Sequence, residues 1–473
     1  MKFYCDDTKI RDEHGRQRIF KGINLCMKDP NISPRRLRKF LYTAGSTTLE
    51  TCKKCGVNII RLGITWALIE SKRGIYNNEA LTIIKEFVND CEDMGIYVVI
   101  DMHQDLFSKK FHGDGAPNWA IDDNIKGQKY LAIWAEGYFY MDSVQQAFFD
   151  FWNNKNGCLD DFARCWDYLR NYFKDCSNVI GFDYLNEPYV DKNGRKIFLE
   201  IVKRIYSLSF GKDFDFERYF INSKDRNGFI KTVLKITSAI KSPSGVKKLL
   251  SDIDDYDNFK AVIDGLEKYT DEFNKGNYQK FTDMMADKNK TDKFNLFEHN
   301  YYANLGINFD IDMPNNSIYS PHAYDIFIDS ALYDNYSSND RVQYILDKIR
   351  DNQLKMNVPV IFGEWGGTGF TGDKWTEHID YIYRQFEKNQ WSSIYWHLDN
   401  NKKKLIEIFN RPYPCAVCGD ISEYSTNAKS RVFKMRWVQE DDCKDVKNIV
   451  FIPQLGFTEI DGKKGENSIT MKY

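Results

Sequence analysis

The sequence lacks the features that would place this protein in a membrane, on nucleic acid or in the secretory pathway. No apolar run approaches the roughly 18 residues of a transmembrane helix, so no membrane span is expected. The formal net charge is only -2, and without a basic surplus there is no electrostatic case for binding nucleic acid. The first residues, Met1–Asp7, contain no apolar stretch of the kind found in signal peptides.

An even set of cysteines is also missing. The chain has 11 cysteines, whereas a secreted protein of this size more often pairs its cysteines evenly. We therefore expect reduced thiols and a cytoplasmic location, with secretion as the alternative if a leader peptide has been removed.

Two Cys-x-x-Cys pairs could supply four thiolates to a structural zinc ion. They are Cys52/Cys55, in an expected helix, and Cys415/Cys418, at an expected domain junction. We interpret them as unrelated reduced cysteines, and we predict no metal and no cofactor.

What the sequence does contain is a regular alternation of strands and helices from residue 18 to about residue 400. Amphipathic stretches such as Asn78–Met94 and Arg341–Asn352 separate the candidate strands. Eight such strands predict an α/β fold, a parallel (β/α)8 TIM barrel, whose chemistry lies at the carboxyl ends of the strands. The candidate strands are Arg18–Asn24, Val57–Leu62, Tyr97–Met102, Val179–Leu185, Phe294–Glu298, Ser317–Pro321, Val358–Gly363 and Ser392–His397.

A second, smaller domain is expected at the carboxyl end. The run Arg411–Pro414 interrupts the helical rhythm, and short alternating stretches follow at Val432–Val438 and Ile449–Pro453. We therefore predict a catalytic barrel over residues 1–408 and a small β-sandwich-like domain over residues 409–473. Within the barrel, a helical insertion is expected near residues 205–285, because that connection is longer than one crossover needs.

Two glutamates at the ends of expected strands are the most informative residues. Glu187 follows one apolar strand in the sequence Asn-Glu-Pro, and Glu364 follows another in Gly-Glu-Trp-Gly. Hydrolysis of a glycosidic bond requires two facing carboxyl groups, one to protonate the leaving oxygen and one to attack the anomeric carbon or activate water. The alternative is a pair of solvated carboxylates without a chemical role.

Other expected strands also end in polar or aromatic side chains. In chain order with the two glutamates, these residues resemble the recurring active-site set of glycoside hydrolase family 5, which is Arg, His, Asn, Glu, His, Tyr, Glu and Trp. All eight residue types occur in that order on the expected strands. They are Arg61, His103, Asn186, Glu187, His322, Tyr324, Glu364 and Trp396.

The resemblance narrows to the endoglycoceramidase branch of that family. It covers most of the chain, apart from roughly residues 205–285, and that departure leaves the shape of one side of the cleft undefined. The segments that carry it are Gly22–Asn24 with Lys28, Asp101–Asp105, Gly113–Ala120 and Arg411–Gly419.

The resemblance implies a role for each member of the set. Glu187 is expected to be the general acid and then the base, with a raised pKa, and Glu364 the ionised nucleophile. Arg61 and Tyr324 would keep Glu364 anionic. Asn186 would hold the sugar 2-hydroxyl, and His103 would position other sugar hydroxyls. His322 would orient the acid/base, and Trp396 would form the floor under the sugar ring. Lys28 and Asp105 would contact the glycan.

The implied activity is that of a retaining β-glycosidase that cuts between glycan and ceramide in a glycolipid substrate, at a membrane or micelle surface. A β-glucosidase acting on glucosylceramide or steryl glucosides, and a family 5 endoglycanase acting on polysaccharide, stay open as alternatives. A binding module without catalysis is a further alternative, against which the intact set of eight residues speaks. For the lipid we expect an apolar surface built partly from Phe210, Phe214 and Phe216 and from the junction near Tyr413.

Overall fold

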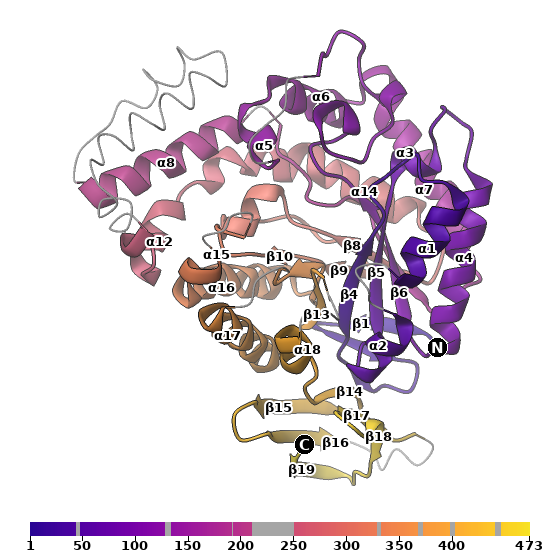
Figure 1. Cartoon of the computed structure of the whole chain (residues 1–473), viewed down its shortest axis with the longest axis vertical. Coiled ribbons are helices and arrows are strands. Elements are labelled where there is room, and N and C mark those ends of the chain that lie inside the picture. Colours follow the sequence, from indigo (N-terminus) through magenta and orange to yellow (C-terminus); the bar gives the residue numbers. More distant parts are fainter. Residues whose placement is uncertain are drawn as a thin grey trace.

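The centre of the molecule is a barrel of parallel strands surrounded by helices (Figure 1). The computed structural model describes residues 1–43, 48–127, 134–191, 193–210, 250–328, 333–367, 372–397, 403–439 and 446–473. Its 8-stranded sheet has the order β11-β13-β4-β5-β6-β7-β8-β9. These strands are β4 (Lys21–Cys26), β5 (Ile59–Thr65), β6 (Tyr97–His103), β7 (Val179–Asp183), β8 (Phe294–Phe297), β9 (Ser317–Tyr319), β11 (Ile361–Phe362) and β13 (Ser392–Tyr395).

The sheet closes on itself between its two outer strands. Tyr319, at the end of β9, forms a parallel bridge with Val360 next to β11, and its backbone N–H donates to the carbonyl oxygen of Pro359 at 3.0 Å. Just beyond, the short strands β10 (His322–Ala323) and β12 (Glu364–Trp365) pair in parallel. The predicted (β/α)8 barrel is therefore confirmed.

The interior of the barrel consists of an apolar layer beneath a charged one. Alternate residues of a strand share a face, so Ile59 and Arg61 of β5 point the same way, as do Val99 and Asp101 of β6. The lower residues pack into one buried cluster with side chains from the other strands, and the charged ones lie nearer the carboxyl ends. The cluster includes Ile59, Val99, Ile180, Phe294, Ile318, Ile361 and Ile394.

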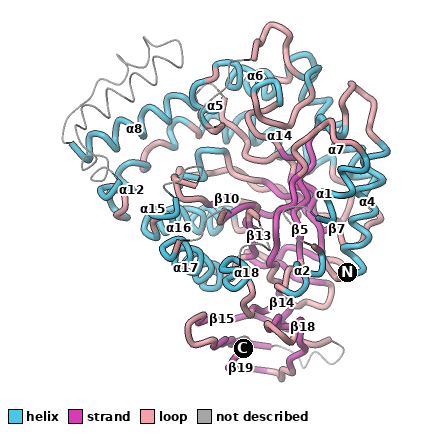
Figure 2. Tube along the Cα trace, viewed as in Figure 1, coloured by secondary structure: helices cyan, strands magenta, loops and turns pink. Residues whose placement is uncertain are grey.

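Amphipathic helices cover the outside of the barrel, as Figure 2 shows in cyan around the magenta strands. Helix α4 (Asn78–Asp93) begins after Asn77, whose side chain accepts a hydrogen bond from the backbone N–H of Ala80. Its buried residues recur at three- and four-residue spacing, as expected for a helix packed on one face. The other helices include α1 (Pro34–Thr43), α2 (Leu49–Lys54), α3 (Trp66–Ile69), α5 (Glu136–Tyr140), α6 (Asp142–Trp152), α7 (Cys158–Phe173), α15 (Tyr333–Tyr336), α16 (Asn339–Met356), α17 (Asp373–Asn389) and α18 (Lys403–Phe409).

The connection between β7 and β8 is the longest in the barrel, and its described part contains several helices. It includes α8 (Gly194–Phe210), α12 (Tyr256–Ile263) and α14 (Gln279–Lys288). Phe214 and Phe216, and the side chain of Phe210, lie outside the described part of the chain. Within the described ranges, no helix has both the length and the apolar character needed to cross a membrane.

The carboxyl-terminal domain consists of two antiparallel sheets. One is the three-stranded sheet of β15 (Asp420–Asn427), β16 (Val432–Gln439) and β19 (Gly465–Lys472). The other contains β14 (Tyr413–Val417), β17 (Asn448–Ile452) and β18 (Gly456–Ile460). A core that includes Phe433, Trp437 and Phe451 lies within this domain, which accords with the small β-sandwich predicted from the sequence.

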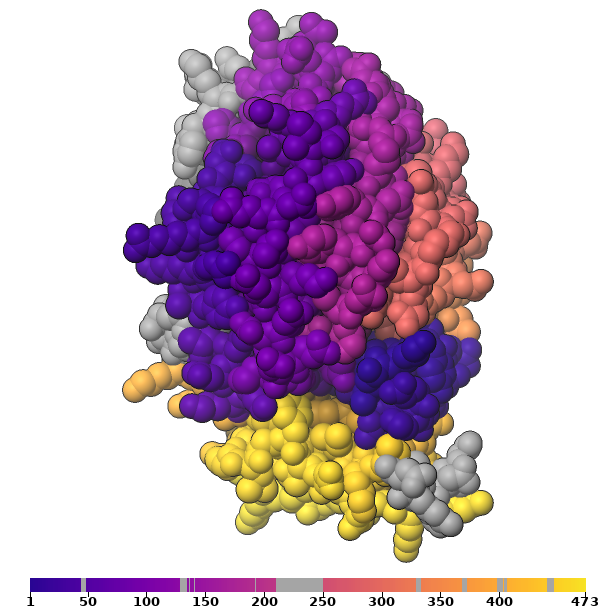
Figure 3. All heavy atoms as spheres, turned by 90° about the vertical axis from the view of Figure 1, so that its right-hand side faces the viewer, coloured from indigo at the N-terminus to yellow at the C-terminus, as the bar shows by residue number. Residues whose placement is uncertain are grey.

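The amino-terminal residues belong to the same domain. The strands β1 (Phe3–Asp6), β2 (Lys9–Asp12) and β3 (Gln17–Arg18) extend its larger sheet, and β3 pairs with β14. Figure 3 shows the indigo amino-terminal atoms against the yellow carboxyl-terminal domain. The expected strand Arg18–Asn24 is therefore divided, because β3 ends in this sheet and β4 begins in the barrel three residues later.

Candidate active site

Glu187 lies four residues after the end of β7, in a backbone conformation that few residues with a side chain adopt. Its φ is 44°, in the left-handed region, and the residue is only 7% exposed. Its Oε1 accepts a hydrogen bond from Asn304 Nδ2 at 2.8 Å and lies 3.1 Å from His322 Nδ1. Burial raises the pKa of Glu187 above its ordinary value, and His322 opposes part of that increase. The carboxyl group is thus held in place and biased toward its protonated form.

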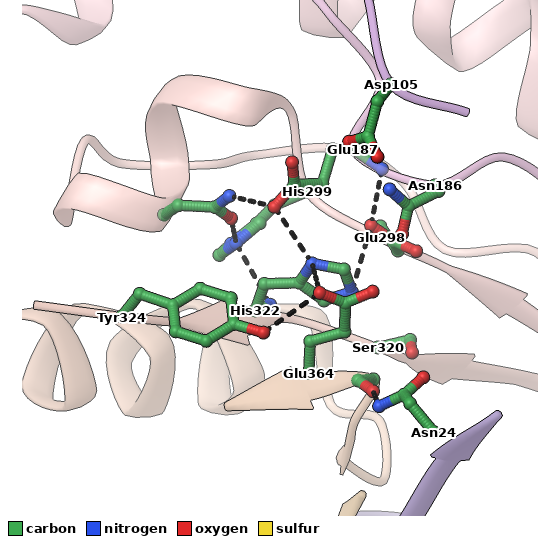
Figure 4. Close-up of polar contacts among 12 residues, drawn as sticks. Asn24, Asp105, Asn186, Glu187, Glu298, His299, Ser320, His322, Tyr324 and Glu364 are labelled. Carbon is green, nitrogen blue, oxygen red and sulfur yellow. Dashed lines mark hydrogen bonds and ion pairs between the residues drawn. The ribbon is translucent and has the colours of Figure 1, made fainter. Parts of the chain in front are cut away.

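Glu364 lies on β12, opposite Glu187 across the barrel mouth (Figure 4). Its Oε1 accepts from Arg61 Nη1 at 2.8 Å, and its Oε2 accepts from the Tyr324 hydroxyl at 2.9 Å. A cation and a hydroxyl donor on the two oxygens stabilise the anionic carboxylate. The two glutamates therefore have opposite surroundings, which is the arrangement that separates an acid from a nucleophile.

Arg61 lies beneath Glu364 and binds it together with three other acids. It is fully buried, and its guanidinium contacts four carboxylates at 2.7–2.9 Å. Burial and the nearby Glu298 raise the pKa of Asp183 well above its ordinary value, because one guanidinium cannot neutralise so many acids. The four partners are Asp101, Asp183, Glu298 and Glu364.

A second group of polar residues lies at the ends of β4, β6 and β13. The Lys28 ammonium pairs with Asp105 and lies 5.0 Å from the centre of the Trp396 ring. The Trp396 and His103 rings stack with centroids 5.5 Å apart, and His103 Nδ1 lies 3.0 Å from Asp101. An aromatic face beside charged donors and acceptors is suited to a sugar ring and its hydroxyls.

Both carboxyl groups open into one cavity of about 600 Å³. One end carries the polar residues just described, and the other end is apolar. The apolar wall is formed by α5, α8, α12, the 3-10 helix Tyr301–Leu305 and the segment 326–328. Its side chains include Phe139, Phe198, Ile201, Val202, Ile205, Phe259, Ile263, Leu305 and Phe327.

The structure brings the ten residues named from the sequence into one place. Arg61 and His322 lie beneath the cavity and contact its carboxylates. The other eight line it, namely Lys28, His103, Asp105, Asn186, Glu187, Tyr324, Glu364 and Trp396.

Sequence reasoning missed Glu298 and Asn304. Glu298 follows β8 directly, so the signal that identified Glu187 and Glu364, a carboxylate at a strand end, was present there too. Asn304 lies in a 3-10 helix that follows a loop, and nothing in its local sequence marks it.

The expectation that Tyr413 contributes to the lipid approach is wrong. Tyr413 is buried in the core of the carboxyl-terminal domain, where its hydroxyl donates to the carbonyl oxygen of Gly56 at 2.7 Å. Tyr413 begins β14, whose sheet includes the amino-terminal strands, and it does not line the cavity.

The Cys-x-x-Cys pairs and three clusters of acidic and histidine side chains are the groups that could hold a metal ion. Cys52, Cys55, Cys415 and Cys418 are buried, and burial raises the pKa of Cys52 to about 12. Among the described residues, the groups close enough to share a cation consist of His, Asp and Glu alone. Arg61 and Lys28 already supply positive charge to two of these groups, Asp101/Asp183/Glu298 and His103/Asp105/Asp114.

The curated proteins similar to this chain include endoglycoceramidases and glucosylceramidases. An endoglycoceramidase of Cyanea nozakii is 32% identical over 206 residues, which cover 39% of this chain and 41% of that protein. A glucosylceramidase of Cryptococcus neoformans is 32% identical over 124 residues, which cover 24% of this chain and 17% of that protein. The chain thus spans about two fifths or less of the length of these relatives.

A solved structure shares the fold over nearly the whole chain. Endo-glycoceramidase II from Rhodococcus sp., in its ganglioside GM3 complex, superposes with a TM-score of 0.67 at 18% identity, covering 98% of this chain and 99% of that one. The family model "Cellulase (glycosyl hydrolase family 5)" matches residues 13–208 and 267–402, and "Glycoside hydrolase family 5 C-terminal domain" matches residues 411–470. The chain is therefore a glycoside hydrolase that belongs to glycosyl hydrolase family 5.

Proposed function

We propose that this protein is a retaining β-glycosidase that hydrolyses the bond between glycan and ceramide in glycosphingolipids. The observation that carries the proposal is the cavity that holds both glutamates between a polar wall and an apolar wall. A glycolipid presents the same division, because its glycan is polar and its ceramide is apolar on opposite sides of the bond to be cut.

The position of each glutamate indicates which wall binds which part. A general acid lies beside the leaving oxygen, which in a glycolipid belongs to the lipid. Glu187 follows β7, and the connection from β7 to β8 supplies α8 and α12, the helices of the apolar wall. Glu187 therefore lies on the lipid side, while Lys28, His103 and Trp396 face the glycan from the other side.

The separation of the two carboxyl groups supports retention of configuration. One oxygen of Glu187 and one of Glu364 lie within 4.8 Å of each other. Retaining enzymes hold the two groups about 5–5.5 Å apart, whereas inverting enzymes leave about 6.5–9.5 Å for a water molecule. The spacing leaves direct attack by Glu364 as the geometrically favoured first step.

In the proposed double displacement, a Glu364 oxygen attacks the anomeric carbon while Glu187 protonates the glycosidic oxygen. The carbon–oxygen bond to ceramide breaks, and a covalent glycosyl ester forms on Glu364. Glu187, now ionised, takes a proton from water, whose oxygen attacks the same carbon and releases Glu364. Two inversions give the β anomer of the free glycan.

The contacts of Glu187 indicate which of its oxygens transfers the proton. Asn304 donates to Oε1 at 2.8 Å, and His322 Nδ1 also faces Oε1 at 3.1 Å. With Oε1 facing two nitrogen groups, we assign the transferred proton to Oε2. Asn304 and His322 then fix the rotation of the carboxyl group so that Oε2 faces the leaving oxygen.

A β-glucosidase acting on glucosylceramide or steryl glucosides is the second candidate, and the same apolar wall supports it. The difference lies in the room beyond the first sugar. Two further hollows, of about 220 and 450 Å³, adjoin the polar wall at Lys28, and Phe40 of α1 lines both. This space favours a glycan longer than one sugar.

Three substrates assayed side by side test the proposal: a fluorescent ganglioside, glucosylceramide and soluble cellulose. We expect intact oligosaccharide and free ceramide from the ganglioside, with the β anomer formed first by NMR. Hydrolysis of glucosylceramide alone would favour the second candidate. Activity confined to cellulose, or an α anomer as first product, would overturn the proposal.

A further inference from the structure

We propose that Glu298 is a positioning residue that keeps His322 positively charged and holds the backbone of Glu187 in place. The inference rests on the proposed roles of Glu187 and Glu364. Glu298 follows β8, is 1% exposed, and lies next to the backbone of Glu187 and the ring of His322 (Figure 4). Neither the family match nor the residues named from the sequence assign it a role.

Three donor groups face the carboxylate of Glu298. Arg61 Nη2 donates to Oε1 at 2.7 Å, and the backbone N–H of Glu187 donates to Oε2 at 2.7 Å. His322 Nε2 lies 3.2 Å from the same Oε2, at ion-pair distance. A carboxylate accepts on both oxygens, whereas a glutamine would turn its NH2 group toward one of these donors. These three groups therefore favour a carboxylate over an amide at this position.

The bond to Glu187 supports a strained part of the backbone. A φ of 44° is unfavourable for a residue with a side chain and persists only where the surroundings hold it. Glu298 binds the N–H of Glu187, and Gln104 Nε2 donates to the carbonyl oxygens of Asn186 and Glu187 at 2.8 and 3.2 Å. Both sides of this residue are thus fixed, which aims its carboxyl group at the cavity.

Three acids, Glu187, Glu298 and Glu364, lie around the ring of His322. Its Nδ1 lies 3.1 Å from Glu187 and 3.7 Å from Glu364, its Nε2 faces Glu298, and its backbone N–H points to His299 Nε2 at 3.3 Å. Burial lowers the pKa of His322, but Glu298 and Glu364 outweigh that effect and raise it well above the ordinary value. Burial lowers the pKa of His299 to about 3, so His299 is neutral and Arg61 is the further cation that reaches Glu298.

The charge on His322 bears directly on the acid/base. An imidazolium beside Glu187 stabilises its ionised form and so limits the pKa increase that burial causes. Without the negative charge of Glu298, His322 loses its proton more readily. A neutral imidazole no longer stabilises ionised Glu187, so the pKa of Glu187 rises further. Glu298 therefore sets the pH above which Glu187 no longer carries the proton that the leaving oxygen needs.

The test compares the pH dependence of kcat/KM for three variants on a soluble β-glycoside with a weakly acidic leaving group, whose departure needs the proton of Glu187. The basic limb is the fall of kcat/KM at high pH, where Glu187 loses its proton. In Glu298→Gln we expect this limb to move to a pH higher by roughly one unit. We also expect kcat to fall by roughly 10²-fold, because Glu187 is misplaced. Glu298→Asp keeps the charge and should keep the limb near its wild-type position despite a lower kcat. A purely structural role would lower kcat in both variants without moving the limb.

Asp101→Asn is the matched control. Asp101 contacts the same Arg61 Nη2 atom at 2.9 Å but borders His103 rather than His322. It should lower activity and leave the basic limb unmoved. An unchanged limb in Glu298→Gln, or an equal shift in Asp101→Asn, would overturn the inference.

Two further measurements cover two other cases. One tests the inference if a variant does not fold, and the other distinguishes its failure from a failure of the proposed function. If Glu298→Gln does not fold, NMR titration of the imidazoles in the wild-type protein decides: a neutral His322 at the pH of the basic limb contradicts the inference. Glu187→Ala should lose the basic limb altogether. If Glu187→Ala keeps the basic limb, Glu187 is not the acid/base and the proposed function is wrong. If Glu187→Ala loses the limb while Glu298→Gln shows no shift, only the proposed role of Glu298 is wrong.

Discussion

The two walls of the cavity are built from different kinds of structure. The polar wall consists of side chains at the ends of barrel strands. Lys28 pairs with Asp105 and lies over the Trp396 ring, which stacks on His103. Much of the apolar wall consists of α8 and α12, which belong to the long connection between β7 and β8. The difference separates chemistry from selection of the lipid, because an inserted connection can change without moving the strand ends that hold the two acids.

The strongest test of this separation removes the nucleophile. Glu364→Gln keeps the shape of the side chain but loses the attacking anion, so turnover should fall by at least roughly 10⁴-fold on lipid and soluble substrates alike. Initial rates on a ganglioside and on an aryl glycoside measure this, with thermal unfolding as the check on folding. If the variant loses activity on only one of the two substrates, catalysis and lipid selection do not belong to separate parts of the cavity.

The next test separates substrates by their leaving group. Glu187→Ala should lower kcat/KM on the glycolipid by roughly 10²–10⁴-fold, because an alkoxide leaves poorly without a proton. An aryl glycoside with an acidic phenol should be affected much less in that step. Azide should then restore turnover by attacking the glycosyl ester on Glu364 and should yield the β-glycosyl azide. If azide instead rescues Glu364→Ala with inversion and has no effect on Glu187→Ala, the two roles need to be reassigned.

A smaller effect is expected from the apolar wall. Replacing Phe198, Ile201 and Ile205 with serine removes apolar surface that we assign to the lipid, so KM for micellar glycolipid should rise by at least roughly tenfold. The soluble aryl glycoside should show no change, since it does not reach this wall.

The matched control for that variant is Leu208→Ser. Leu208 lies on the same helix, is exposed and does not line the cavity. It should leave both substrates unaffected. Equal losses on both substrates in the triple variant would mean that α8 supports the fold rather than the lipid.

The smallest expected effect concerns stability on the polar wall. Burial and the neighbouring Asp105 raise the pKa of Asp114 to about 7 in the folded protein. Between about pH 4 and pH 7 the unfolded chain has already lost this proton while the folded protein retains it, so this group lowers stability as pH rises. Asp114→Asn should remove that loss and unfold at a temperature higher by roughly 2 °C or more at pH 8. Thermal unfolding at pH 4 and pH 8 measures it; an equal difference at both values would refute the assignment.

Much of the barrel could be predicted from the sequence because its elements carry local signals. The strands β5 and β6 are buried on both faces and appear as short apolar runs, and α4 has the spacing of a helix packed on one side. The amino-terminal strands carried no such signal. β3 has two residues and its partner β14 lies about 400 positions away, so their pairing depends on contacts that no local pattern records.

The sequence by itself determined which residues stand at the strand ends, including Glu187 and Glu364, because a parallel barrel gathers the carboxyl ends of its strands at one mouth. Only the tertiary structure decided what surrounds them. The positive φ of Glu187, the Asn304 amide on its oxygen, and the contact of Glu298 with both Arg61 and His322 each join distant parts of the chain. Burial and the charges of neighbouring groups act through space rather than along the sequence, and they are what give two chemically identical glutamates different surroundings.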